Sequence, residues 1–278
     1  MSKILTESQC EDFARDGYLF PLDCLKAEEA GACRSRLEAY EAEVGEAERG
    51  RLIRVKSHLA FPWMMDLARQ PNILDAVEDL IGPDILLYLS SVWVKGAHDP
   101  GFVSWHQDGT YYGLDPHEEV AAWIALSNST VESGCVRVIP GSHLGADLPH
   151  EETHDPDNLL SRGQTIAQVD GGGAVDMELA AGQFSLHHER LIHGSAPNNS
   201  DDRRIGISFM YIPARVRSSV GRGAAVLVRG EDRFGHWDAD PEPRFDLDPV
   251  SMAAMARAQS GYRDENRRSE AERSGGER

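Results

Sequence analysis

Three side chains of this sequence could bind a metal ion together, namely His106, Asp108 and His193. Two imidazoles and one carboxylate form a facial triad that holds Fe(II) from one side and leaves its other coordination positions open for a co-substrate and O2. If the segment around residue 106 is a strand, alternation points His106 and Asp108 to the same face. His193 follows 193 − 106 = 87 residues later, so a separate element must bring it to the site. The triplet His-x-Asp alone is a weak signal.

The sequence that follows His193 contains groups suited to an anion. Arg204 comes 204 − 193 = 11 residues later, on the predicted strand that leaves a turn rich in Pro and Asn. Arginine binds carboxylates through two parallel hydrogen bonds, and the hydroxyl of Ser195 could donate to the same carboxylate. Iron, a dicarboxylic 2-oxo acid and O2 together indicate 2-oxoglutarate-dependent oxygenation.

Several stretches around these residues give a resemblance that is more specific than any single motif. The sequence resembles the phytanoyl-CoA dioxygenase family of Fe(II)/2-oxoglutarate oxygenases from about residue 7 to about residue 213. The stretches that carry it are 104–113 (SWHQDGTYYG), 122–126 (AWIAL), 134–143 (GCVRVIPGSH) and 193–204 (HGSAPNNSDDRR). The resemblance implies that His106, Asp108 and His193 are iron ligands. Halogenating members replace the carboxylate ligand by a small residue, so Asp108 implies hydroxylation or another oxidation.

The resemblance also implies a pocket for 2-oxoglutarate. Arg204 and Ser195 would hold the distal carboxylate, while Gln107 and Trp123 would line the pocket. Alternation lets only one of two adjacent arginines point inward, so Arg203 is expected to face solvent or to pair with a neighbouring aspartate. A regular strand would turn Gln107 away from the ligand side, and Trp123 could equally be a core aromatic residue.

Residues near the triplet could contact a substrate. Thr110, Tyr111 and Tyr112 follow the predicted ligands closely, and Tyr88 lies on the predicted strand before the triplet. Lys95 ends that strand and is expected to be a solvated charge.

Composition limits the partners. The chain has 278 residues, and its net charge of −18 argues against nucleic acid and against an anionic membrane surface. The net negative charge could keep the protein in solution, or it could attract a cationic substrate. No apolar run is long enough for a transmembrane helix, and the N-terminus lacks a signal-peptide core. The four cysteines show no paired spacing, so a cytoplasmic location is expected.

The residue pattern predicts a mainly β domain with flanking helices. A capping box at residues 6–9 begins a helix that stops at Gly17. The expected helices span 7–16, 25–44, 62–69 and 71–81, and the expected strands span 18–21, 85–95, 119–126, 135–139, 174–179, 183–188 and 204–212. Short strands with Gly, Pro and Asn turns favour a sandwich or jelly roll, and the resemblance implies a double-stranded β-helix (jelly roll, cupin-like) core.

We expect a single oxygenase domain over residues 1–260. It would consist of a helical N-terminal region (1–84), a jelly-roll core (85–215) and a C-terminal extension (216–260), followed by a disordered tail at 261–278. Residues 144–168 are the longest irregular stretch and could form an active-site lid.

The leading hypothesis is an Fe(II)/2-oxoglutarate-dependent dioxygenase. It would oxidise a C–H bond of a small polar or amine-bearing metabolite or natural-product intermediate, by hydroxylation or oxidative ring closure, with release of succinate and CO2. The alternative is a non-catalytic metal-binding β-barrel with a sensing or structural role. A zinc hydrolase lacks support, because the sequence indicates no general base or oxyanion hole. The sequence makes no prediction of oligomeric state.

Overall fold

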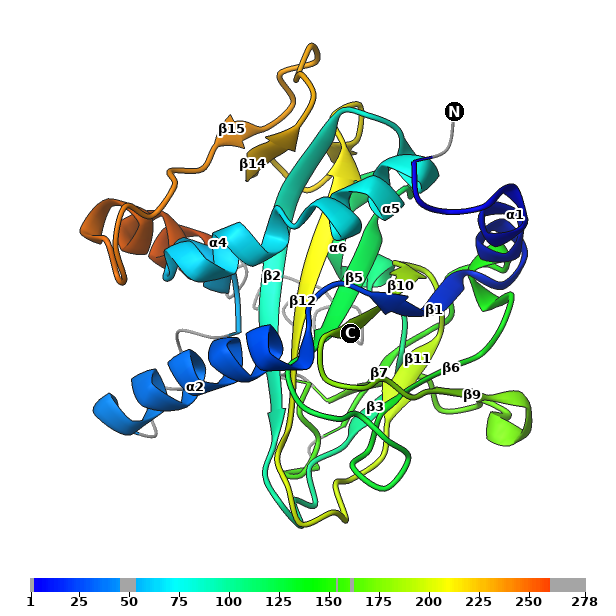
Figure 1. The fold of residues 1–278 in the computed structure, drawn as a ribbon. Helices are drawn as coiled ribbons and strands as arrows, with labels where there is room; N and C mark the ends of the chain where they lie inside the picture. The colour runs from blue at the N-terminus through cyan, green and yellow to red at the C-terminus, as the bar shows by residue number, and fades with distance from the viewer. Residues whose placement is uncertain (1–2, 46–53, 154, 161–162, 261–278) are drawn as a thin grey trace, which may run out of the picture.

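A large antiparallel sheet forms the centre of the protein (Figure 1). The computed structural model describes residues 3–45, 54–153, 155–160 and 163–260. In spatial order the strands of this sheet are β1 (Tyr18–Asp23), β10 (Gln183–His188), β5 (Val120–Ala125), β12 (Arg204–Pro213), β2 (Ile85–Lys95), β14 (Ala224–Arg229) and β15 (Asp238–Ala239). Only the β14–β15 pair is parallel within the described sheet.

A smaller sheet packs against one face of the large one. Its strands in spatial order are β3 (Val103–His106), β11 (His193–Ser195), β6 (Val136–Val138) and β9 (Val175–Met177). Trp123 of β5 lies in one apolar cluster with Val136, Val138 and Met177, which joins the two sheets. Over the described residues the two sheets remain separate and do not close into a barrel.

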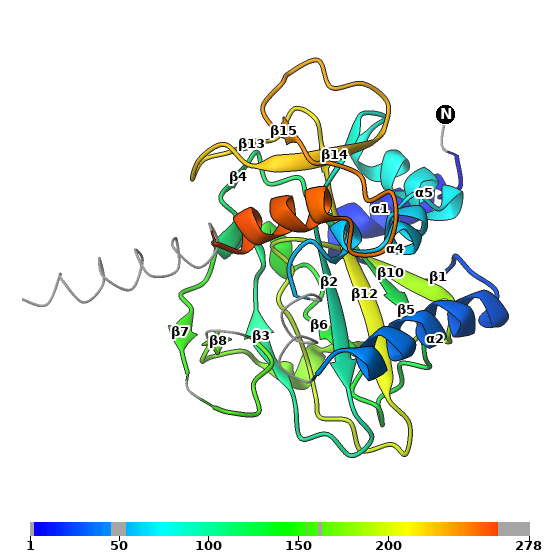
Figure 2. The ribbon, with the colours of Figure 1, turned by 90° about the vertical axis from the view of Figure 1, so that its left-hand side faces the viewer.

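Helices cover the opposite face of the large sheet. They are α1 (Glu7–Asp16), α2 (Ala27–Glu43), α4 (Pro62–Ala68) and α5 (Pro71–Ile81), and a short helix α6 (Gly109–Tyr112) follows β3. Figure 2 shows α2 and α5 on one side of β2 and β12, and β3 on the other. This arrangement leaves the inner face of the large sheet, which is turned toward the small sheet, to build the site.

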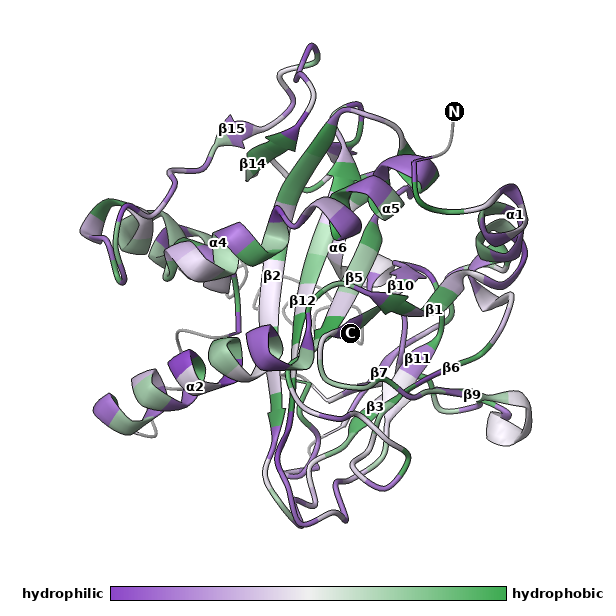
Figure 3. Ribbon diagram, viewed as in Figure 1, coloured by the Kyte–Doolittle hydropathy of each residue, from purple (hydrophilic) through white to green (hydrophobic). Residues whose placement is uncertain are grey.

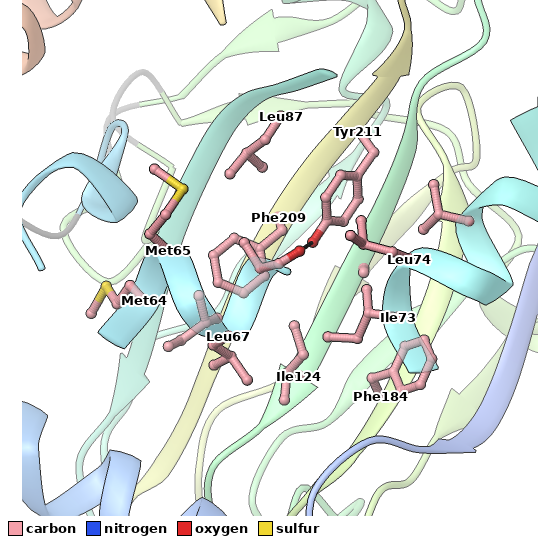
Figure 4. Packing of buried hydrophobic residues seen from close by; sticks show 14 of the residues in the cluster. Met64, Met65, Leu67, Ile73, Leu74, Leu87, Ile124, Phe184, Phe209 and Tyr211 are labelled. Carbon is pink, nitrogen blue, oxygen red and sulfur yellow. Dashed lines mark hydrogen bonds between the residues drawn. The ribbon is translucent and has the colours of Figure 1, made fainter. Parts of the chain in front are cut away.

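The main core lies between this sheet and the helices. Phe209 and Ile124 of the sheet pack against Met64 and Ile73 of the helices, and all four are buried (Figure 4). The hydroxyl of Tyr211 donates to Ala68 O at 2.7 Å, so its one polar atom is satisfied inside the core. Figure 3 shows the corresponding pattern, with hydrophobic stretches on the central strands and hydrophilic and hydrophobic residues mixed along α2.

Several predicted elements are confirmed to the residue. They are helix 71–81 and strands 85–95 and 183–188. The capping box is also confirmed, since the Thr6 hydroxyl accepts from Gln9 N and the Gln9 side chain accepts from Thr6 N. Gly17 ends this helix with φ +84°, a left-handed conformation that favours glycine.

The prediction of an irregular stretch over 144–168 was only partly right. The described residues of this stretch contain a short strand pair, β7 (Glu151–Glu152) with β8 (Gln164–Thr165). Ser104 of β3 donates to Gln164 O, so this pair is attached to the small sheet. The predicted disordered tail, residues 261–278, lies outside the described residues.

The C-terminal extension adds to the edge of the large sheet. β14 pairs with β2, and β13 (Arg217–Ser218) pairs with β4 (Leu114–Asp115). A buried ion pair between Lys56 and Asp240 connects the extension to the segment before α4. Among the described residues, no helix has the length and apolar character needed to cross a membrane.

Candidate metal centre

The structure brings His106, Asp108 and His193 together. His106 Nε2 lies 3.3 Å from Asp108 Oδ1, and His193 Nε2 lies 3.9 Å from Asp108 Oδ2. One ligand atom from each residue lies within 4.8 Å of the other two. Adjacent ligand atoms of one ion lie about 3 Å apart when each bond is about 2.1 Å long. Small side-chain adjustments would therefore let the three groups bind one ion.

The two histidines come from adjacent strands of the small sheet. His106 ends β3 and pairs directly with His193, which begins β11. The prediction that Asp108 continues the same strand was wrong, because β3 stops at His106 and Asp108 has helical dihedral angles (φ −66°, ψ −40°) before α6. The turn of the chain, rather than strand alternation, places the carboxylate beside the imidazoles.

Backbone carbonyls fix both imidazoles in the form that a metal requires. His106 Nδ1 lies 2.9 Å from Ser104 O, and His193 Nδ1 lies 2.9 Å from Leu191 O. Because a carbonyl only accepts, each Nδ1 must carry the proton, which leaves the lone pair of Nε2 free for a metal. Burial and the nearby His106 lower the pKa of His193 to about 3, so its ring is neutral near pH 7.

The carboxylate of Asp108 is ionised in this setting. Burial alone would raise its pKa, but the adjacent rings of His106 and His193 outweigh burial, so the pKa lies below its ordinary value. His187 adds a third buried ring, 4.8 Å from the ring of His193, and burial lowers its pKa to about 4. The donor set of two neutral imidazoles and one carboxylate suits Fe(II).

Two buried cations lie on the same side of the site. Arg204 begins β12 and pairs across the sheet with Lys95, the last residue of β2. The expectation that Lys95 is solvated was wrong, because its side chain is buried and Nζ donates to Ser195 Oγ at 2.7 Å and to Ala196 O. Ser195 lies two residues after His193 on β11, so the cations adjoin the candidate metal ligands.

Arg204 has no acidic partner among the described residues. Its Nε and Nη2 donate to Gly134 O at 3.2 and 2.8 Å, and its guanidinium lies 5.1 Å from the centre of the Trp123 ring. Burial lowers its pKa to about 10, so it keeps its charge near neutral pH. A buried guanidinium without a counter-ion, next to Lys95, is a preformed site for an anion.

Arg203 faces the other way. The expectation that it faces solvent or pairs with a neighbouring aspartate was wrong for its side chain, which donates to Glu38 at 3.1 Å and to Glu41 at 2.7 Å on α2. Because side chains alternate along an extended chain, Arg203, just before β12, lies on the face toward α2 and Arg204 lies on the opposite face.

Gln107 lies between His106 and Asp108 in the sequence. Its Nε2 donates to Arg190 O at 2.8 Å, and its Oε1 accepts from Leu148 N at 2.9 Å. Its backbone N donates to His150 Nε2 at 2.9 Å. The Oε1 end of the amide and the backbone N thus connect the triplet to the segment before β7.

The residues suggested for the substrate side lie in different surroundings. Thr110 is exposed, whereas Tyr88 is buried and packs edge-on against Tyr112 with ring centres 5.5 Å apart. The side chain of Tyr111 lies outside the described portion of the chain. Tyr88 and Tyr112 are therefore side by side, and Thr110 is at the surface.

Sequence reasoning missed two buried glutamates near the triad. Glu119 and Glu189 are both fully buried. Each flanks an apolar strand, and a charged residue at such a position is usually solvated. The backbone N of Gly109, directly after Asp108, donates to Glu189 O at 2.9 Å, so Glu189 adjoins the triad of His106, Asp108 and His193.

Gly206 is the point where the sheet allows the Trp123 ring to lie beside Arg204. A Cβ at this position would lie 1.9 Å from Cζ2 of Trp123. We expect Gly206→Ala to displace the indole and to destabilise the fold by about 1–3 kcal/mol, the usual cost of overpacking. Thermal unfolding and the near-ultraviolet circular dichroism of tryptophan would measure both effects.

A second glycine provides the control for this substitution. Gly31 lies within α2, and an added Cβ would meet no atom within 4 Å. Gly31→Ala is expected to stabilise the protein by about 0.5–1 kcal/mol, because alanine favours a helix. An unchanged melting temperature for Gly206→Ala would contradict the close packing of Trp123.

Comparison with known proteins adds the family context. Residues 13–206 match a family model described as phytanoyl-CoA dioxygenase (PhyH). A relative from Stutzerimonas stutzeri, named probable alpha-ketoglutarate-dependent hypophosphite dioxygenase, is 29% identical over 208 residues, which cover 73% of this chain and 72% of the relative.

Solved structures show the same architecture. The non-heme monooxygenase ThoJ in its apo form is 34% identical, with a TM-score of 0.80 over 92% of this chain and 96% of ThoJ. The epimerase SnoN, solved in complex with Fe3+, alpha ketoglutarate and nogalamycin RO, is 25% identical, with a TM-score of 0.62 over 76% of this chain and 85% of SnoN.

Proposed function

Because this chain belongs to the phytanoyl-CoA dioxygenase family, we propose that it is an Fe(II)- and 2-oxoglutarate-dependent dioxygenase. It would oxidise a C–H bond of a small polar molecule, by hydroxylation or oxidative ring closure, and release succinate and CO2. The observation that carries the proposal is the juxtaposition of two sites. A triad suited to Fe(II) adjoins a buried pair of cations, Lys95 and Arg204, that fits a carboxylate.

Each residue of the site has a role in this proposal. His106, Asp108 and His193 hold the iron, which when bound supplies the oxidising chemistry. Arg204 and Lys95 bind the distal carboxylate of 2-oxoglutarate, and Ser195 positions Lys95 through their hydrogen bond.

Other residues shape the surroundings. Trp123 closes the pocket beside Arg204 and excludes water, which strengthens the ionic contacts. Gln107 Oε1 accepts from Leu148 N and so holds the segment before β7 against the triplet. In this proposal Gln107 also lines the pocket for 2-oxoglutarate. The described residues of the stretch 144–168 would act as a lid over the substrate.

The proposal includes a domain organisation. Residues 1–260 form a single oxygenase domain, and the two sheets form the double-stranded β-helix of a jelly roll. The packing of Trp123 on β5 against Val138 on β6 supports one shared core.

Anaerobic spectroscopy would test the proposal. We expect the protein to bind one equivalent of Fe(II) and then to develop a weak visible charge-transfer band when 2-oxoglutarate is added. In air, the same protein should release succinate. Bound iron without a band would contradict the proposal and favour a metal-binding β-barrel with a sensing or structural role.

The affinity for 2-oxoglutarate should depend on pH through Lys95. Burial, with a further contribution from Arg204, lowers the pKa of Lys95 to about 7. A bound carboxylate favours the charged ammonium, so binding above pH 7 must take up a proton. We expect the Kd to increase between pH 7 and pH 9, by up to about tenfold per unit while the bound ammonium stays protonated.

Calorimetry in buffers with different ionisation enthalpies would measure this proton uptake. A Lys95→Arg variant provides the control, because its guanidinium stays charged over this range. The same pH dependence in this variant would show that another group is responsible.

A further inference from the structure

The inner face of the large sheet changes from cationic to acidic along its strands. On β5, Trp123 and Ala121 point to this face, and Glu119 follows by alternation. On β10, His187 pairs with Ala121, and Glu189 follows on the same face. Glu189 N donates to Glu119 O at 3.3 Å, so the two glutamates are neighbours. They lie at the opposite end of β5 from the arginine and lysine site.

Neither carboxylate has a partner that balances its burial. All four carboxylate oxygens are inaccessible and lack a hydrogen bond within the described residues, and no Lys or Arg there forms an ion pair with them. His117 Nδ1 approaches Glu189 Oε1 at 3.3 Å without hydrogen-bond geometry. Burial and mutual repulsion raise the pKa of Glu119, and burial raises the pKa of Glu189 to about 8. Buried polar groups without partners cost stability unless a ligand satisfies them.

A phenol supplies an independent sign of a binding site. The hydroxyl of Tyr88 is buried and has no hydrogen-bond partner in the described structure. Tyr88 lies in one apolar cluster with Ala121, which comes two residues after Glu119 and points to the same face. Burial, and then the charges of Tyr112 and Glu119, raise the pKa of Tyr88. The Tyr88 ring also packs against Trp237, with centres 5.7 Å apart. Carboxylates beside aromatic rings are a combination that binds ammonium groups.

We propose that Glu119, Glu189 and Tyr88 form the substrate-binding end of the site and that the substrate carries a protonated amine. This inference rests on the proposed oxygenase function. A nearby ammonium favours the ionised carboxylates, so binding would release protons from this pair. The N–H groups of the ammonium would then donate to carboxylate oxygens that have no donor among the described residues, and the Tyr88 hydroxyl would complete the contact. Arg204 would hold the anionic co-substrate at the other end of the site. One end of the site would therefore favour a cation and the other end an anion.

Paired probes would test this substrate class. The probes are isoamylamine, phenethylamine and tryptamine, each beside its neutral N-acetyl counterpart. Binding is measured anaerobically as the change in the charge-transfer band of the Fe(II)–2-oxoglutarate complex, and turnover in air as succinate release. We expect the amines to bind at least about tenfold more tightly than the amides, as a charge-assisted hydrogen bond to a carboxylate would give.

Variants assign the effect to these residues. Glu119→Gln should weaken amine binding by about tenfold or more and leave the affinity for 2-oxoglutarate unchanged. Tyr88→Phe should weaken amine binding while it preserves ring packing, and it keeps the test decisive if Glu119→Gln does not fold. Glu118→Gln is the matched control, because Glu118 pairs with Arg215 at 2.7 Å, outside the proposed site.

The outcomes separate this inference from the proposed function. Absence of the band in wild-type protein would overturn the oxygenase function itself. A normal band with equal binding of amines and amides, with no binding of any amine, or with unchanged amine binding in both Glu119→Gln and Tyr88→Phe would overturn the amine-binding site alone.

Discussion

Replacement of His106 by alanine is expected to weaken Fe(II) binding by more than about 100-fold. Loss of a group that only hydrogen-bonds to a metal ligand already lowers metal affinity by about 10–100-fold, and loss of the ligand itself should cost more. The variant loses one of the three proposed ligands, and it also loses the imidazole beside Asp108 that helps to keep this carboxylate ionised. Equilibrium dialysis under anaerobic conditions, followed by metal analysis, would measure the affinity.

A surface histidine provides the control for this variant. His98 lies 2.9 Å from Asp201 with most of its side chain exposed, so His98→Ala should bind Fe(II) as the wild type does. Wild-type iron affinity in His106→Ala would show that the metal, if any, binds elsewhere.

Replacement of Arg204 by methionine is expected to raise the Kd for 2-oxoglutarate by roughly 100-fold, since a charge-assisted hydrogen-bond pair contributes about 3 kcal/mol. Methionine fills similar space beside Trp123 but has no donor. Fe(II) binding should be unchanged, because Arg204 contacts Gly134 and not the triad. Titration of the charge-transfer band with 2-oxoglutarate would give its Kd, and anaerobic dialysis would give that of Fe(II).

The adjacent arginine is the matched control. Arg203→Met removes the contacts with Glu38 and Glu41 on α2, which should lower the melting temperature without changing the Kd for 2-oxoglutarate. An equal loss of affinity in both variants would mean that the effect comes from the position of β12 and not from the Arg204 guanidinium.

The proximity of His106 and Asp108 could be predicted because the two residues are close in the sequence. His106 and Asp108 are two residues apart, and the turn after β3 keeps them adjacent even though the strand ends earlier than expected. The exact strand end was not predictable, because the backbone N of Gln107 donates to the distant His150 and does not continue the ladder.

The charged residues at the two ends of the inner face could not be predicted in the same way. Lys95 is a strand-end lysine in sequence, and only its pairing with Arg204 on β12 shows that it is buried. Glu119 and Glu189 are 189 − 119 = 70 residues apart in the sequence. The pairing of β5 with β10 makes them neighbours in the fold. Burial of this kind depends on tertiary contacts, for which a single sequence carries little signal.

The backbone hydrogen bonds of the two histidines have an evolutionary consequence. Ser104 O and Leu191 O orient the imidazoles, so no neighbouring side chain is needed for that task. Substitutions at the acidic end, such as those at Glu119 or Tyr88, can therefore change substrate preference while the metal ligands keep their orientation. On the proposed assignment, a descendant of this protein could acquire a new substrate by changes at Tyr88 on β2 and at Glu119 just before β5, and retain the same proposed iron site.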